Sequence, residues 1–223
     1  MKRILPFLIV AVVGLTTVAG GMKLYRAARR VHSLDPKDLP ESERPQVGAR
    51  HVRGDADAPV TLVEFGDFEC GPCGKLAGVS DQIENGYQHQ HQLRVVFRHF
   101  PLDVHEHAMS AAQAAEAADL QGHFWEMYRL LYRDQTAWAT AEDPQSVFDS
   151  YAKTLGLDID RFTKDMESPE VKERIEADRE RGVRLGITAT PKIYINDVEV
   201  PMPATVASIR AAIDEALKRK LSP

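Results

Sequence analysis

Apolar residues occur both in short unbroken runs and at helical spacing, and this pattern predicts strands and helices in a defined order. The segment Pro59–Gly66 is rich in β-branched and apolar residues, which is typical of a buried strand. Leu93–Phe100 is a second such run. Between them, Leu76, Val79 and Ile83 recur at helical spacing. A strand–helix–strand order predicts a parallel pair joined by a right-handed crossover.

Residues from about 103 to about 186 show helical periodicity throughout, which predicts a block of several helices. Its apolar stripes have the spacing of core-facing helix surfaces. The stripes consist of Ala108, Ala111, Ala112, Ala115 and Ala118; Phe124, Trp125, Tyr128 and Leu131; Val147, Phe148, Tyr151 and Leu155; Ile159, Phe162 and Met166; and Val171, Ile175 and Gly182.

The pattern returns to strands after this block. KIYIN, a turn at Asn196-Asp197, and Val198-Glu199-Val200 together predict a β-hairpin. A last helix is expected over about 205–220. The predicted fold class is therefore α/β, a mixed sheet flanked by helices and interrupted by the helical block.

A different pattern occupies the N-terminus. From Ile4 to Met22, 19 residues carry no charge, close to the roughly 20 that cross a bilayer as a helix. We expect a membrane anchor over residues 1–30, with a cleaved signal peptide as the alternative. Residues 31–50 hold three prolines and many charges, so we expect a linker that forms no core. Residues 51–223 are then the folded domain.

Charge is divided unevenly between these segments. The 223 residues carry a net charge of -5, and residues 1–30 carry six positive charges and no acid, so the remainder carries -11. An acidic body argues against nucleic acid as a partner. Four of the positive charges follow the apolar segment and two precede it, which by the positive-inside rule favours a cytoplasmic domain. The function inferred below favours the opposite side, and we give the function more weight.

The chemistry centres on the only two cysteines, Cys70 and Cys73, which stand between a predicted strand and a predicted helix. Residues three apart on a helix lie close enough for a disulfide to form with small adjustments. Pro72 suits a first helical turn, which places Cys70 at the positive end of the helix, where a thiolate is stabilised. Cys70 is therefore the expected nucleophile and Cys73 the thiol that resolves the mixed disulfide. Asp67 and Glu69 are nearby negative charges, which raise the pKa of a thiol.

Other interpretations of the pair remain open at this point. Zinc needs about four ligands, and a second CxxC is absent. A permanent structural disulfide or two inert buried thiols are further alternatives, although a disulfide that closes so short a loop adds little stability. Several histidines could offer nitrogen ligands, but none has a clear spacing relative to the cysteines: His89, His91, His99, His105 and His107.

Three segments in order resemble the DsbA-like branch of the thioredoxin superfamily. RGDADAPVTLVEFGDFECGPC is similar to that branch's first strand and active site, and FRHFPLDVHEHAMSAAQAAEAADLQGHFWEMYRLLY to its inserted helices. GITATPKIYINDVEV is similar to its cis-proline loop and hairpin. The resemblance implies a thioredoxin fold and thiol–disulfide exchange, with no cofactor beyond a redox-active Cys70–Cys73 disulfide.

The resemblance also implies roles for individual residues. Pro191 matches the cis-proline that faces the active-site sulfur, and the backbone of Thr190 would meet a substrate strand. Glu64 matches a buried acid that takes the proton of Cys73 during resolution. Arg98 is a weak candidate for a positive charge near Glu64, and an exposed surface arginine is the simpler interpretation.

The expected partners are protein thiols and disulfides in the cell envelope, a membrane redox partner, and the lipid bilayer through residues 4–22. The Gly71-Pro72 dipeptide is that of thioredoxin, whereas the strongly oxidising DsbA proteins carry a histidine between their cysteines. We therefore expect a reduction potential between about -270 mV and about -120 mV, nearer the former. The alternative function is a membrane-tethered binding or chaperone module in which the CxxC is incidental.

Overall fold

The computed structural model describes residues 36, 39–88 and 91–221, and residues 34–223 form one compact unit. The expected anchor at residues 4–22 lies outside the described residues. Within the described ranges, no helix combines the length and the hydrophobicity needed to cross a bilayer.

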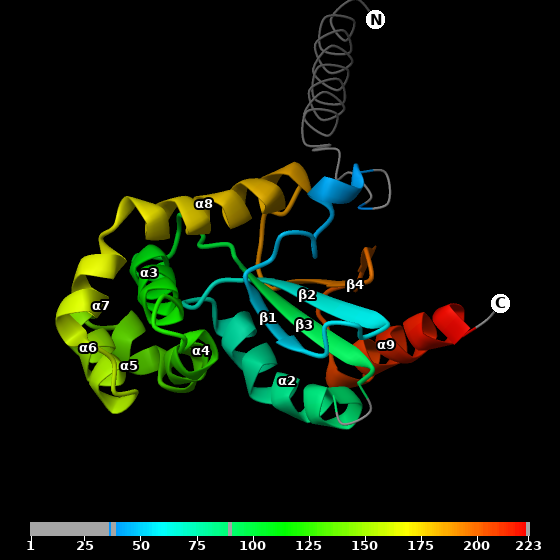
Figure 1. The fold of residues 1–223 in the computed structure, drawn as a ribbon, viewed down its shortest axis with the longest axis horizontal. Coiled ribbons are helices and arrows are strands. Elements are labelled where there is room, and N and C mark those ends of the chain that lie inside the picture. The colour runs from blue at the N-terminus through cyan, green and yellow to red at the C-terminus, as the bar shows by residue number, and fades with distance from the viewer. Residues whose placement is uncertain (1–35, 37–38, 89–90, 222–223) are drawn as a thin grey trace, which may run out of the picture. The chain divides into compact units, whose positions relative to one another are not determined.

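The centre of the compact unit is a five-stranded mixed sheet with the strand order β1-β3-β2-β4-β5 (Figure 1). The predicted parallel pair, β2 and β3, is confirmed, and β1 and β4 flank it in antiparallel orientation. The hairpin between β4 and β5 is also confirmed, whereas β1 was not predicted. The strands are β1 His51–Gly54, β2 Val60–Gly66, β3 Leu93–His99, β4 Lys192–Ile195 and β5 Val198–Glu199.

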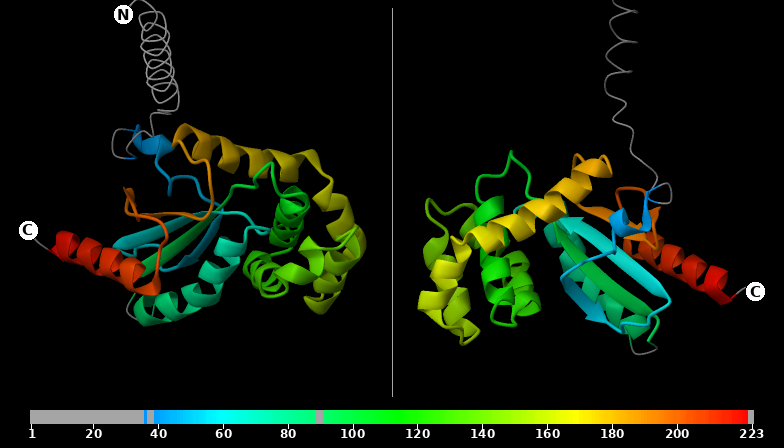
Figure 2. Two further views of the ribbon diagram at one scale, coloured as in Figure 1. Left: turned by 180° about the vertical axis from the view of Figure 1, so that it is seen from behind. Right: turned by 45° about the horizontal axis from the view of Figure 1, so that its top comes forward.

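The two faces of the sheet have separate cores. Helices α2 (Gly71–Gln88) and α9 (Val206–Leu221) cover one face (Figures 1 and 2), where Leu62 and Val95 pack with apolar residues of both helices. Alternate residues of the same strands point to the other face, where Val63 packs with Tyr194, Leu185 and Ile187. Both faces of the central strand are therefore buried, as its unbroken apolar run predicts.

The predicted helical insertion lies between β3 and β4 and has its own core (Figure 1). The alanine stripe of α3 is almost completely buried in that core. Helix α8 then returns over the sheet, where Gly182 allows close contact: a Cβ there would lie 2.5 Å from Cδ2 of Phe100. The helices are α3 Ala108–Asp119, α4 Phe124–Arg133, α5 Gln135–Ala139, α6 Gln145–Thr154, α7 Ile159–Met166 and α8 Pro169–Arg184.

Residues 39–50 differ from the linker that was expected. Leu39 is buried in the core below α8, and a short 3-10 helix, η2, spans Glu41–Glu43. Arg98 holds this segment because its guanidinium donates to the carbonyls of Pro45 and Val47, each at 2.6 Å. The same guanidinium pairs with Asp178 of α8. Arg98 is therefore neither an exposed arginine nor the charge beside Glu64, and the prediction that this part of residues 31–50 forms no core is wrong.

Candidate active site

The two cysteines lie where β2 passes into α2. The turn is closed by the Cys70 N–H, which donates to the Asp67 carbonyl at 3.1 Å. The Gly74 N–H donates to the Cys70 carbonyl at 3.1 Å, so Cys70 stands directly at the N-terminus of the helix. Its residue surface is 5% exposed and that of Cys73 is 0% exposed, which makes Cys70 the more accessible thiol.

The two thiols are free, and their pKa values are shifted in opposite directions. A hydrogen bond from the Cys73 thiol lowers the pKa of Cys70 to about 6, against the effect of burial. Burial and that same hydrogen bond raise the pKa of Cys73 well above its usual range. Only Cys70 is therefore a thiolate near neutral pH.

Thr190 and Pro191 lie against Cys70, although 120 residues separate them in the sequence. The peptide bond between them is cis, and Cys70 Sγ donates to the Thr190 carbonyl at 3.3 Å. Thr190 is 9% exposed, and its hydroxyl oxygen has no hydrogen-bond partner among the described residues. The loop before β4 thus presents a backbone carbonyl and a hydroxyl beside the Cys70 sulfur.

Glu64 is buried in β2, on the face of the sheet that α2 covers. Burial raises its pKa to about 8, and its negative form in turn raises the pKa of Cys73. The positive charge of Arg53 in β1, which pairs with Glu84 of α2, acts against the rise of the Glu64 pKa. These residues line a cavity of about 10 Å³, and Glu64 Oε1 has no hydrogen-bond partner within the described part of the chain.

Asp67 is the buried acid closest to the turn, and its negative charge raises the pKa of Cys70. One carboxylate oxygen accepts from the Glu69 N–H at 2.8 Å. The other accepts from the Leu102 N–H at 2.9 Å and lies 2.7 Å from Nδ1 of His105. Although partial burial lowers the pKa of His105, Asp67 produces a net rise. Asp67 therefore favours the protonated form of His105, whose positive charge would offset the buried carboxylate.

The insertion also holds the active-site turn, which the sequence did not reveal. Gln135 of α5 donates through Nε2 to the carbonyls of Phe68 at 2.6 Å and Cys70 at 3.1 Å. The Tyr132 hydroxyl donates to the Asp67 carbonyl at 3.2 Å. Nothing in the spacing of Gln135 relative to the cysteines points to this contact, because it depends on how the insertion packs.

Two adjoining hollows of about 400 Å³ each open beside Pro72 and Pro191. Both are mainly apolar, and Met202, 40% exposed, borders both. The hollow toward α9 is lined by Pro72, Lys75, Leu76, Val79, Pro191, Met202, Pro203, Ala204, Thr205 and Val206. An apolar side chain of a bound peptide fits such a surface.

Comparison with known proteins agrees with this geometry. The family model described as thioredoxin matches residues 46–215, most of the chain. The chain belongs to the thioredoxin family. A thioredoxin-like oxidoreductase from Silicibacter pomeroyi DSS-3 is 25% identical with a TM-score of 0.68, covering 81% of this chain and 99% of that one. Pseudomonas aeruginosa DsbA2 is 25% identical with a TM-score of 0.60, covering 82% and 99%. The expected DsbA-like membership of the thioredoxin superfamily is confirmed.

Curated relatives of this thioredoxin-family chain are much longer. Na(+)/H(+) antiporter NhaA 1 of Mycolicibacterium gilvum is 38% identical over 169 residues, which are 74% of this chain and 26% of that protein. The chain thus spans about a quarter of the length of the curated relatives it matches. The antiporter name belongs to those longer proteins.

Proposed function

We propose that this protein is a thiol–disulfide oxidoreductase acting on cell-envelope proteins, with Cys70 as nucleophile and Cys73 as resolving thiol. The observation that carries the proposal is the opposite shift of the two thiol pKa values beside the cis Thr190–Pro191 bond. A low pKa supplies the thiolate that attacks, while a high pKa keeps the second thiol protonated until the mixed disulfide has formed.

In the reducing direction, the Cys70 thiolate attacks one sulfur of a substrate disulfide, and the other substrate sulfur leaves as a thiolate. The Cys73 thiol then loses its proton to Glu64 and attacks Cys70 Sγ. This forms the Cys70–Cys73 disulfide and releases the second substrate sulfur. The reverse sequence oxidises a dithiol. A pKa of about 8 leaves both forms of Glu64 populated near neutral pH, so the carboxyl group can accept or return the proton.

Thr190 gives the substrate a place to bind. In the thiol form, Cys70 donates to the Thr190 carbonyl, and a thiolate cannot do so. Ionisation of Cys70 therefore frees this carbonyl to pair with an extended substrate strand. The apolar hollows beside Pro191 favour substrates with an exposed hydrophobic side chain near the reacting cysteine, as in unfolded chains.

The experiment is insulin reduction with the unaltered protein, Cys70→Ser and Cys73→Ala. Both variants are expected to lose turnover, and only Cys73→Ala accumulates a mixed disulfide with the substrate. Unchanged activity in Cys70→Ser would favour the alternative, a tethered binding or chaperone module.

The direction of electron flow follows from the reduction potential, which we place between about -270 mV and about -120 mV and nearer the former. A glutathione redox titration of residues 34–223 measures it, and a value near that of DsbA would contradict this part of the proposal. The titrated protein should begin at residue 34 because residues 39–50 pack onto the domain.

We further propose an envelope location, with residues 4–22 in the bilayer and a membrane protein as redox partner. A reporter fused after Pro223 and active only outside the cytoplasm tests the location. Thiol trapping of Cys70 in cells then distinguishes an oxidase, found mostly as the disulfide, from a reductase.

A further inference from the structure

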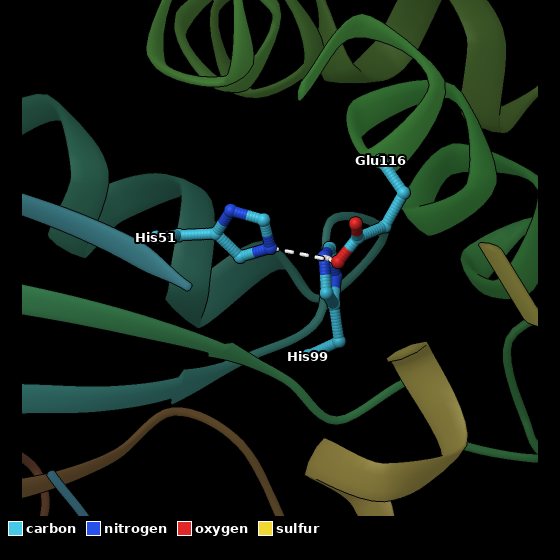
Figure 3. A group of neighbouring side chains, drawn as sticks. All are labelled: His51, His99 and Glu116. Atoms are coloured by element: carbon cyan, nitrogen blue, oxygen red, sulfur yellow. Dashed lines mark hydrogen bonds and ion pairs between the residues drawn. The ribbon is translucent and has the colours of Figure 1, made fainter. Parts of the chain in front are cut away.

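A second polar site, which includes neither cysteine, lies where the sheet meets the insertion (Figure 3). His51 begins β1, His99 ends β3, and Glu116 comes from α3. Each side chain is only 1% exposed. One ligand atom from each residue lies within 4.8 Å of the other two. Three sequence-distant elements thus bring two imidazoles and one carboxylate together in the interior.

The three side chains point at a common centre. Nε2 of His51 lies 2.7 Å from Glu116 Oε1, and Nε2 of His99 lies 3.2 Å from the same oxygen. Figure 3 shows both rings directed at this carboxylate. His99 Nε2 is buried and makes no hydrogen bond of good geometry to any described residue. The centre therefore contains an imidazole nitrogen whose lone pair or proton is not fully used.

The outer atoms of the same side chains face charged groups. His51 Nδ1 lies 3.5 Å from Oδ1 of Asp119, and Glu116 Oε2 lies 3.3 Å from the guanidinium of Arg174. The ring of Phe124 stacks on that of His51 with centroids 3.6 Å apart. In metal sites, a carboxylate next to the far nitrogen of a ligand histidine, or a cation next to the far oxygen of a ligand carboxylate, orients that ligand.

The buried carboxylate of this cluster has few cations around it. Arg174 contacts three carboxylates, those of Glu116, Asp119 and Glu170. Although burial lowers the pKa of His51, its hydrogen bonds to Asp119 and Glu116 raise it to about 8, so a proton on His51 is the cation that a metal ion would replace. Because Glu116 is buried, solvent screens its charge poorly.

We propose that His51, His99 and Glu116 bind one divalent transition-metal ion, with Zn²⁺ the best match to two imidazoles and a carboxylate. Zinc bonds of about 2.0–2.2 Å separate two tetrahedral ligands by roughly 3.3–3.6 Å. The His99–Glu116 distance of 3.2 Å is close to this range, and the His51–Glu116 distance must open from 2.7 Å. On binding, the ion takes the Nε2 lone pair of each ring, any proton there passes to solvent, and a water fills the fourth position.

Such an ion would join β1 and β3 of the sheet to α3 of the insertion, so its main effect would be on stability. The site involves neither cysteine, and it does not depend on the proposed oxidoreductase activity.

The test uses the full-length protein in detergent with Cys70→Ser and Cys73→Ser, because thiols also bind zinc. After equilibrium dialysis against Zn²⁺ and then metal-free buffer, we expect close to one zinc per chain and a raised unfolding temperature that a chelator reverses. His99→Gln and Glu116→Gln should each lose most of the zinc. The matched control is His91→Gln, since His91 is exposed and pairs with Asp55 outside the cluster.

Co²⁺ provides a measurement that does not depend on the fold of a variant. With the three ligands unaltered, bound Co²⁺ should show the strong visible absorption of a tetrahedral site, and Zn²⁺ should displace it. Zinc content equal in His99→Gln and His91→Gln, or absence of both zinc and the cobalt spectrum, would overturn the proposal. The cluster would then be a hydrogen-bonded junction only.

Discussion

Replacement of Glu64 by glutamine should stabilise the reduced protein at neutral pH. Burial raises the pKa of this carboxyl from an ordinary 4.5 to about 8. Below about 4.5 the group is protonated in both the folded and unfolded states. Between these two values the unfolded state ionises while the folded state keeps its proton. Because the folded state then binds more protons, stability falls by about 1.4 kcal/mol per pH unit.

The magnitude at pH 7 follows directly. About 2.5 pH units of this slope lie below pH 7, which amounts to roughly 3 kcal/mol. Glutamine has a similar shape and no ionisation, so Glu64→Gln avoids this loss. The expected difference in free energy of unfolding is therefore near zero close to pH 4.5 and rises to about 3 kcal/mol at pH 7 in favour of the variant.

Urea unfolding of reduced residues 34–223 at several pH values measures this difference. Glu126→Gln, on the exposed side of α4, controls for the loss of a carboxylate as such. A difference that does not change between about pH 5 and pH 7 would refute the reasoning, because Glu64 would then ionise in the folded protein as it does in the unfolded one. In the same variant, resolution of the mixed disulfide by Cys73 should slow, since the proposed proton acceptor is gone.

Three further outcomes follow from the contacts around the site. Asp67→Asn should lower the pKa of Cys70 because it removes a negative charge, and the pH profile of the alkylation rate should shift to lower pH; an unchanged profile would contradict this prediction. The variant should also lose about 1–3 kcal/mol of free energy of unfolding, because an amide donor would face the Leu102 N–H. Gln135→Ala should cost about 1–2 kcal/mol in urea unfolding and slow insulin reduction, whereas its exposed neighbour in Thr136→Ala should change neither. Gly182→Ala should cost about 1–3 kcal/mol by forcing a Cβ against Phe100, and a variant as stable as the unaltered protein would mean that α8 can shift at no cost.

The sequence predicted elements whose apolar spacing is unambiguous. The run that became β2, the alanine stripe of α3 and the return into β4 all occur where the pattern placed them. Burial of Glu64 was also predictable, because it lies in the middle of an otherwise apolar strand. Its exact neighbours were not, since the cation that acts on it comes from Arg53.

The parts that were missed depend on contacts distant in sequence. The four residues of β1 include only one large apolar residue, Val52, and become a strand because they pair with β3. Arg98 looks like a surface residue until the carbonyls of residues 45 and 47 and the carboxylate of Asp178 surround it. His51 and Glu116, which are 65 positions apart, have no spacing that would indicate a shared site.

The hydrogen bonds from Gln135 and Tyr132 to the turn at residues 67–70 affect how this protein can be engineered. Donors on α4 and α5 satisfy the backbone carbonyls of Asp67, Phe68 and Cys70, so this turn cannot be moved to another protein without them. A chimera that exchanges the inserted helices for those of a relative inherits whatever donors the new helices offer at these two positions. Transplanting residues 67–70 together with Tyr132 and Gln135 should preserve the reactivity of Cys70. Moving residues 67–70 alone should leave their carbonyls without hydrogen-bond partners and make the position of Cys70 less well defined.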